Sequence, residues 1–206
     1  MWRSGDSLKA RSVKVADGDT VRVQHVPLLG QGRDALPTGT KHKLSDTTIQ
    51  VRLYGIDTPE TAKFGASGQA YGMEAKAALQ LLMTSSAHVR VVPIARDRFG
   101  RAIASVHARR WPLLGWLSPE VDVSMRMLDL GLAYVYTQEG AEYEGRKADM
   151  MRREAAARAG GVGMWGEGDA LESPAEYKAR IRSEQAAKEA TKEANNEAAT
   201  KKAEAA

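Results

Sequence analysis

Residues 51–60, VRLYGIDTPE, carry the pattern that decides the fold. Side chains that alternate between two faces are typical of a β-strand, and here they place Arg52, Tyr54 and Ile56 on one face. Pro59 has no N–H to donate to a neighbouring strand, so the strand ends before it. A rigid strand end can aim polar groups at a ligand. The polar residues at this strand end are Asp57, Thr58 and Glu60.

An arginine lies close to these carboxylates in the sequence. Arg52 precedes Asp57 by five residues on the same expected strand. Carboxylates beside an arginine suggest a site that holds a cation and an anion together, such as a metal ion and a phosphate. The strand end is therefore the first candidate for a functional site.

The composition allows one domain with a real core and some appendages, because the chain has 206 residues, 43% of them hydrophobic. A net charge of +4 is compatible with a polyanionic partner but does not require one. The absence of cysteine excludes disulfides and thiolate metal sites. We find neither a signal peptide nor an apolar run of the roughly 20 residues that a membrane helix needs. These features leave the compartment unknown.

Alternating β-branched residues and helical apolar spacing predict the remaining elements. Asp17-Gly18-Asp19 is a turn signal between the first two strands, and its acids can be turn chemistry only. Met73, Met150 and Met151 are interpreted as core residues of their helices. The expected strands cover 12–16, 20–26, 87–95 and 102–108, besides the strand at 51–60, and the expected helices cover 70–83, 122–130 and 141–159.

The connections between these elements are expected to be loops and turns. Residues 27–45 are expected to form a long surface loop, and residues 97–101, DRFGR, a hairpin tip that is either solvated or able to meet a phosphate. Trp111 and Trp116 can pack on the barrel or stack on bases. Residues 163–165, GMW, are expected to pack the end of the domain.

The last part of the chain, residues 172–206, is rich in Ala, Glu and Lys. It lacks a large apolar residue after Ile181, so it cannot bury a face of a helix. We expect a fraying solvent-exposed helix or disorder there. From Leu171 onward seven basic and seven acidic side chains cancel, which leaves the positive charge on the folded part.

Five strands with a helix after the third predict an α+β fold: a five-stranded barrel of the oligonucleotide/oligosaccharide-binding type with about three helices. The ordered segments DGDTV, RLYGIDTPE, YGMEA, DRFGRAIA, LGLAYVY and GMW resemble the staphylococcal nuclease family, and most closely a fungal, membrane-associated branch of it. The resemblance runs from about residue 13 to residue 165. It implies an N-terminal extension (1–11), a nuclease domain (12–168) with an insertion at 27–45, and a charged tail (169–206).

The resemblance also implies roles for individual residues. Asp19 and Asp57 match calcium-binding carboxylates, and Thr58 matches a residue that ligates calcium through its backbone carbonyl. Arg52 and Arg101 match two catalytic arginines, whose planar donor forks suit phosphate oxygens. Oxygen ligands favour Ca²⁺ over zinc, and the four histidines are too scattered for a zinc site.

Further matches concern the water and the substrate. Glu60 matches the carboxylate that positions or deprotonates the attacking water, and Asp17 matches an outer-shell acid. Arg98 matches a residue that contacts the nucleotide phosphate. Tyr134 and Tyr136 match tyrosines that line the nucleotide pocket.

Two departures from the family concern substrate affinity. Phe99 stands where the family often has a tyrosine, and Lys63 is the lone basic residue of a loop that is lysine-rich elsewhere in the family. The leading hypothesis is a calcium-dependent nuclease, acting as a monomer on single-stranded or frayed DNA or RNA and leaving 3′-phosphates. The resemblance makes a mitochondrial or membrane-associated location possible. The alternatives are a non-catalytic module that binds nucleic acid or protein, and a tail that tethers the domain to a partner.

Overall fold

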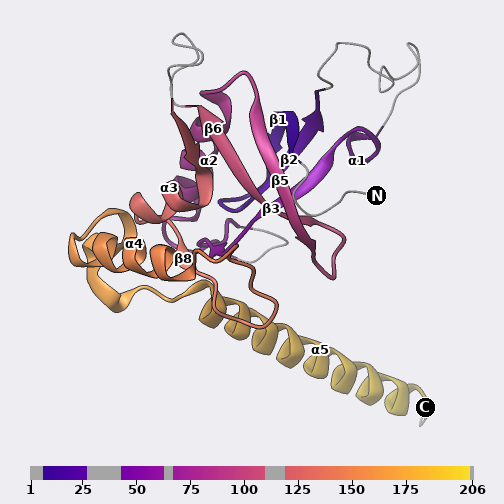
Figure 1. Ribbon diagram of the computed structural model, residues 1–206. Coiled ribbons are helices and arrows are strands. Elements are labelled where there is room, and N and C mark those ends of the chain that lie inside the picture. Colours follow the sequence, from indigo (N-terminus) through magenta and orange to yellow (C-terminus); the bar gives the residue numbers. More distant parts are fainter. Residues whose placement is uncertain (1–6, 27–42, 63–66, 110–118, 205–206) are drawn as a thin grey trace.

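Five strands close into a barrel in the computed structural model, which describes residues 7–26, 43–62, 67–109 and 119–204 (Figure 1). Neighbours pair antiparallel in the order β3-β2-β1-β5-β6, and a parallel pairing of β3 with β6 completes the ring. The α+β class and the five-stranded barrel are thus confirmed. The barrel strands are β1 (Leu8–Val15), β2 (Thr20–His25), β3 (Ile49–Leu53), β5 (Val89–Arg96) and β6 (Ala102–Arg109).

Shorter strands extend the barrel. β7 (Glu120–Asp122) pairs with the end of β6, and β4 (Ile56–Asp57) pairs with β8 (Tyr134–Val135) beside the barrel. The β4–β8 pair places Asp57 opposite Tyr134. Residues that are far apart in sequence therefore meet at the end of β3.

Helices cover one side and one end of the barrel (Figure 1). α2 and α3 lie against the barrel, and α4 packs against α3 and the following 3₁₀ segment η2. α5 is a long helix that projects away from the rest of the molecule. The bounds are α1 (Leu44–Thr47), α2 (Gly72–Thr84), α3 (Val123–Asp129), α4 (Lys147–Ala159), η2 (Gly163–Ala170) and α5 (Pro174–Glu204).

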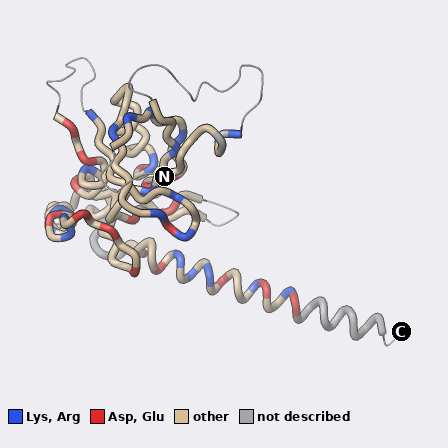
Figure 2. Tube along the Cα trace, turned by 45° about the vertical axis from the view of Figure 1, so that its right-hand side comes forward, with Lys and Arg blue, Asp and Glu red and all other residues tan. Residues whose placement is uncertain are grey.

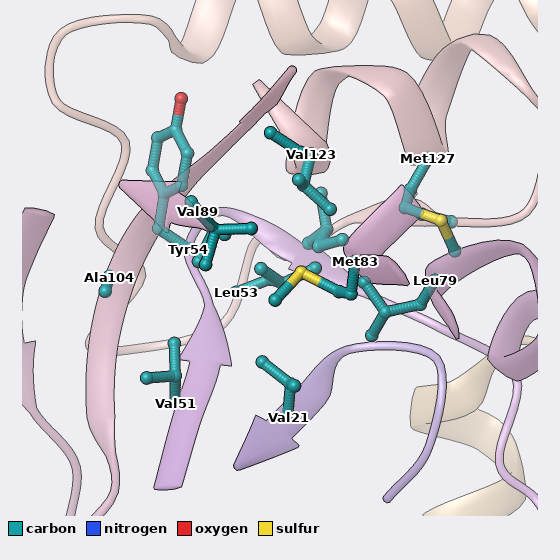
Figure 3. Close-up of a cluster of buried hydrophobic side chains, with 14 of the residues drawn as sticks. Val21, Val51, Leu53, Tyr54, Leu79, Met83, Val89, Ala104, Val123 and Met127 are labelled. Carbon is teal, nitrogen blue, oxygen red and sulfur yellow. The ribbon is translucent and has the colours of Figure 1, made fainter. Parts of the chain in front are cut away.

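The core fills the space between the barrel and these helices (Figure 3). Val51 and Leu53 of β3 meet Leu79 and Met83 of α2 there, and all four are fully buried. Burial of one such side chain stabilises the fold by roughly 1.5–3 kcal/mol. Residues 163–165 pack the end of the domain as expected, because Met164 and Trp165 are also buried.

Alternation along the strand at 51–60 stops at Leu53. Gly55 takes a φ of +66°, which breaks the chain into β3 and β4. Tyr54 and Ile56, expected on the face of Arg52, are both buried in the core instead. The Tyr54 hydroxyl donates to Asp122 at 2.7 Å, which satisfies it inside the protein.

The buried face of α2 differs from the expected one. Its buried residues are Gly72, Ala75, Leu79 and Met83, whereas Met73 is 66% exposed. The assignment of Met73 to the core is therefore wrong. Apolar residues surround almost the whole helix, so spacing alone could not select the face.

The two methionines of α4 also differ in burial. Met150 is buried as expected, but Met151 is half exposed and its assignment to the core is wrong. Successive residues of a helix point about 100° apart, so both could not face the core equally. The helix begins at Lys147 instead of residue 141, because Glu144 and Gly145 have positive φ values that are incompatible with a helix.

Other boundaries differ by a few residues. β1 begins at Leu8, inside the expected extension, and α1 lies at the end of the expected loop 27–45. Residues 27–42, Lys63 and both Trp111 and Trp116 lie outside the described residues. In the part of the chain that the structure describes, we find no helix with the length and apolar character to span a membrane.

Candidate active site

The turn between β1 and β2 brings Asp19 to the end of β3. The backbone N–H of Leu53 donates to the carbonyl of Asp19 at 2.8 Å. A Cβ on Gly18 would lie 2.6 Å from Oγ1 of Thr58 and 2.8 Å from Cβ of Ala75, so only glycine lets the turn approach this closely. The Asp17-Gly18-Asp19 segment thus does more than turn the chain.

Arg52 joins the two carboxylates that the sequence proposes as metal ligands. Its Nη1 lies 2.6 Å from Oδ2 of Asp19, and its Nη2 lies 2.8 Å from Oδ1 of Asp57. The guanidinium also lies over the ring of Tyr136, at 5.6 Å from the centroid. Both carboxylates therefore face one point, beside an aromatic ring.

This pair of carboxylates is buried. Asp19 and Asp57 are 4% and 5% exposed. Burial raises the pKa of Asp19 to about 7, because the nearby charge of Arg52 only partly offsets the loss of water. Burial alone would lower the pKa of Arg52, but the charges of Asp19 and Asp57 raise it, so the guanidinium stays charged.

Glu60 is positioned by its backbone. The Glu60 N–H donates to Oε1 of Gln69 at 2.9 Å, and the Glu60 carbonyl accepts from the Gln69 N–H at 2.9 Å. A Cβ on Gly72, the first residue of α2, would lie 2.5 Å from that carbonyl. The glutamate is thereby held between its own loop and the start of α2.

Lys178 of α5 enters the same site. Its Nζ donates to both carboxylate oxygens of Asp57 at 2.9 Å and lies 3.1 Å from Oε1 of Glu60. Burial alone would lower the pKa of Lys178, but the charges of Asp57 and Glu60 outweigh it and raise the pKa. The tail, expected to be solvated throughout, thus supplies a cation to the site.

Arg101 lies at the base of the β5–β6 hairpin. Its Nε donates to Oδ2 of Asp97 at 2.6 Å. Since Arg52 pairs with Ile103 in the parallel ladder, Arg101 lies two residues from that position, on the same face of the sheet as Arg52. Asp97 therefore fixes Arg101 on the side of the barrel where Arg52 binds the carboxylates.

The three expected substrate-binding residues occupy different surroundings. Tyr136 lies under Arg52, whereas Tyr134 stacks edge-on against Trp165 with centroids 5.0 Å apart. Arg98 lies 4.9 Å from the ring centre of Phe99, which is 70% exposed at the hairpin tip. The described contacts bring Tyr136 to the carboxylates, while Arg98 stays at the hairpin.

A cavity of about 190 Å³ lies next to Glu60, between its loop and the start of α5. Pro59, Gln69, Tyr134 and Tyr177 contribute to its walls. Tyr134 is therefore a wall residue of this cavity.

The donor set at Arg52 fits a hard cation. Within the described ranges, no three carboxylate, imidazole or thiolate side chains form a metal-binding group. Asp19 and Asp57 nevertheless converge on one positive group, and both offer oxygen donors. Calcium accepts such carboxylates and completes its shell with carbonyls and waters, so the residues fit Ca²⁺.

Reasoning from the sequence does not identify two residues of this site, Gln69 and Lys178. Lys178 lies in the segment expected to be solvated. The signal for Lys178 was local: Tyr177 and Ile181 are apolar residues four apart, which marks a short contact face next to the lysine. No local signal marked Gln69.

Comparisons with known proteins identify the family of this chain. The family described as "Staphylococcal nuclease homologue" matches residues 50–167. "Endonuclease Htp3" of Saprolegnia parasitica (strain CBS 223.65) is 40% identical over 174 residues, which are 84% of this chain and 77% of that protein.

Two fungal relatives have nearly the same sequence identity to this chain. "Probable endonuclease LCL3" of Paracoccidioides lutzii (strain ATCC MYA-826 / Pb01) is 38% identical over 85% of this chain and 52% of that protein. "Probable endonuclease lcl3" of Schizosaccharomyces japonicus (strain yFS275 / FY16936) is 36% identical over 85% of this chain and 75% of that protein. The chain thus spans about half the length of the Paracoccidioides relative. The family match and these relatives show that the chain belongs to the staphylococcal nuclease homologues.

Proposed function

We propose that this protein is a calcium-dependent endonuclease that hydrolyses phosphodiester bonds of DNA or RNA, with single strands preferred. A nuclease family and relatives named endonucleases indicate a phosphodiester hydrolase. The observation that carries the proposal for the site is Arg52, which holds Asp19 and Asp57 together at 2.6 and 2.8 Å. Anion-binding and cation-binding groups are thereby adjacent.

The proposed reaction is attack of water on phosphorus. The water oxygen bonds to phosphorus, the bond to the 5′-oxygen breaks, and the leaving 5′-oxygen takes up a proton from solvent, so that a 3′-phosphate and a 5′-hydroxyl result. Glu60 accepts the proton of the attacking water or orients that water, a role worth about 10²–10⁴-fold in rate.

Charge neutralisation is the second requirement, since the substrate is already an anion. Arg52 and Arg101 donate to the non-bridging oxygens of the phosphate, where their fixed forks stabilise the charge that develops. Ca²⁺, held by Asp19, Asp57 and the Thr58 carbonyl, would polarise a phosphoryl oxygen. Tyr136, beneath Arg52, supplies a surface for the nucleotide.

The test compares cleavage of denatured DNA and of RNA by the wild-type protein and two variants. Glu60→Gln is expected to lower the rate by about 10²–10⁴-fold, and Arg101→Ala by roughly 10²–10³-fold. Arg152→Ala is the matched control, because the Arg152 side chain is 75% exposed on α4, where it pairs with Asp149, and its rate should be unchanged.

Rates of both variants equal to wild type would contradict the assigned roles. Circular dichroism of each variant ensures that a loss of rate does not reflect unfolding. Tight oligonucleotide binding with no products, in calcium or in chelator, would identify the non-catalytic binding module instead.

A further inference from the structure

Lys178 reaches the site from a part of the chain that the barrel does not need. It lies 121 positions after Asp57, yet its Nζ contacts both oxygens of that carboxylate and one oxygen of Glu60. Beyond Ile181, residues 182–193 of α5 are exposed, and Figure 2 shows their charges of both signs along the helix. The contact with the site is thus confined to the first turns.

The start of α5 is fixed by its own sequence. Ser173 and Glu176 form a reciprocal cap: the Ser173 N–H donates to Oε2 of Glu176 at 2.8 Å, and the Glu176 N–H donates to Oγ of Ser173 at 3.3 Å. Pro174 suits the first helical position. The first turn is therefore preformed, and Lys178 projects from a defined place.

Two contacts dock that turn onto the site. Tyr177 is 6% exposed, and its hydroxyl donates to the carbonyl of Ser67. The Gln69 side chain donates from Nε2 to the Glu172 carbonyl at 2.9 Å, while its Oε1 accepts from the Glu60 N–H. Gln69 thus ties the backbone of Glu60 directly to the beginning of α5.

The docked lysine binds carboxylate oxygens of Asp57 and Glu60, to which the proposed reaction assigns the cation and the attacking water. Both oxygens of Asp57 accept from Nζ, so neither is free of a cationic partner. The same Nζ lies 3.1 Å from Oε1 of Glu60, the carboxylate assigned to the attacking water. A lysine and a divalent cation cannot both occupy the same face of Asp57, since like charges repel.

We propose that the first turns of α5 are an intramolecular plug, in which the ammonium of Lys178 occupies the Asp57 carboxylate that would bind a divalent cation and also pairs with Glu60. Cation binding then requires α5 to release Lys178, and the plugged protein is inactive. This inference rests on the calcium site proposed above, and it adds a competitor built into the same chain. The plug keeps the nuclease inactive where free calcium is low.

Release of the plug has to break a defined set of contacts. Pro174 and Tyr177 are the buried residues of the first turns, and the Lys178 side chain is 35% exposed while that of Asp57 is 7% exposed. Residues 182–193 are exposed, and Arg182 donates from Nε to the Lys178 carbonyl at 3.0 Å. A cation with two charges can therefore compete with the single charge of the lysine.

The test measures Ca²⁺ binding by isothermal titration calorimetry, without substrate. A plug that occupies the site about nine-tenths of the time weakens apparent affinity about tenfold, so Lys178→Gln is expected to bind Ca²⁺ about tenfold more tightly than wild type. Lys188→Gln is the matched control, because Lys188 is exposed further along α5, and its affinity should equal that of wild type.

A second variant separates docking from charge. Removal of a lysine near a cation would tighten binding even without a plug, so Tyr177→Ala is included, which keeps the charge and removes the anchor. We expect it to tighten Ca²⁺ binding as well. In wild type, hydrogen exchange of amides 175–182 should become faster when Ca²⁺ is added, because α5 undocks.

The outcomes are distinguishable. Equal Ca²⁺ affinity of wild type, Lys178→Gln and Tyr177→Ala, with unchanged exchange in α5, would overturn the plug and leave the proposed calcium site intact. Tighter binding in Lys178→Gln alone would also overturn it, because a charge effect would then suffice. Absence of Ca²⁺ binding in every variant would overturn both the plug and the calcium dependence.

Discussion

At the residue scale, the central feature is one guanidinium shared by two buried carboxylates. Arg52 offsets part of the cost of burying Asp19 and Asp57, which would otherwise stand uncompensated. The sequence predicted this association, because Arg52 and Asp57 lie five residues apart in one segment. It did not predict that the arginine would bind both acids directly, since the approach of Asp19 depends on the tight packing of Gly18 against Thr58.

A second residue, His107 on β6, gives the fold a pH dependence away from this site. Burial and the charge of Arg90 lower the pKa of His107 below its usual value of about 6.5. The unfolded chain then binds a proton near pH 6.5 that the folded chain refuses, so this group lowers stability as the pH falls below that value. The charged groups that influence His107 are Arg90, Asp122, Glu120 and Arg146.

When the pH falls from 7 to 5, we expect the free energy of unfolding to decrease less for the His107→Gln variant than for wild type. Glutamine keeps a partner for the Ser105 hydroxyl, which lies 3.2 Å from Nε2 of His107. The measurement is urea unfolding at both pH values, with His88→Gln as the matched control because His88 is exposed. Equal pH dependence of wild type and His107→Gln would refute the assignment.

At the element scale, the spacing of apolar residues in α2 predicts that a helix forms but does not predict which face of it is buried. Length and composition predicted the helix to within two residues at its start and one at its end. Its buried face could not be predicted, because Ala, Leu and Met occur on every side. Contact with the barrel selects the face that carries Leu79 and leaves Leu81 71% exposed.

The two leucines therefore give a matched pair of variants. Leu79→Ala opens a cavity in the core and is expected to lower the free energy of unfolding by about 2–5 kcal/mol. Leu81→Ala removes an exposed side chain and should change it by about 0.5 kcal/mol or less. Chemical denaturation measures both, and similar losses for the two variants would show that the helix is rotated relative to this description.

At the scale of the whole molecule, the five-stranded barrel could be predicted because five strands, with a helix after the third, follow one another in the order typical of that fold. The acidic and basic residues at the end of β3 were also predicted, because strand, turn and site share one continuous segment. Lys178 could not be placed, since its contact with Asp57 joins two distant parts of the chain. Tyr54 and Ile56 were misplaced because one residue with positive φ, Gly55, ends the alternation.

The central claim is that the paired carboxylates at Arg52 make this barrel a calcium-dependent nuclease. Its most direct test is the initial rate of cleavage of denatured DNA across a calcium titration, for wild type and for Asp57→Asn. We predict a wild-type rate that rises with calcium and falls to background in chelator, and a variant that stays folded but responds to calcium at least roughly a hundredfold less. Equal rates of the two proteins at saturating calcium, or a wild-type rate unchanged by chelator, would contradict the account.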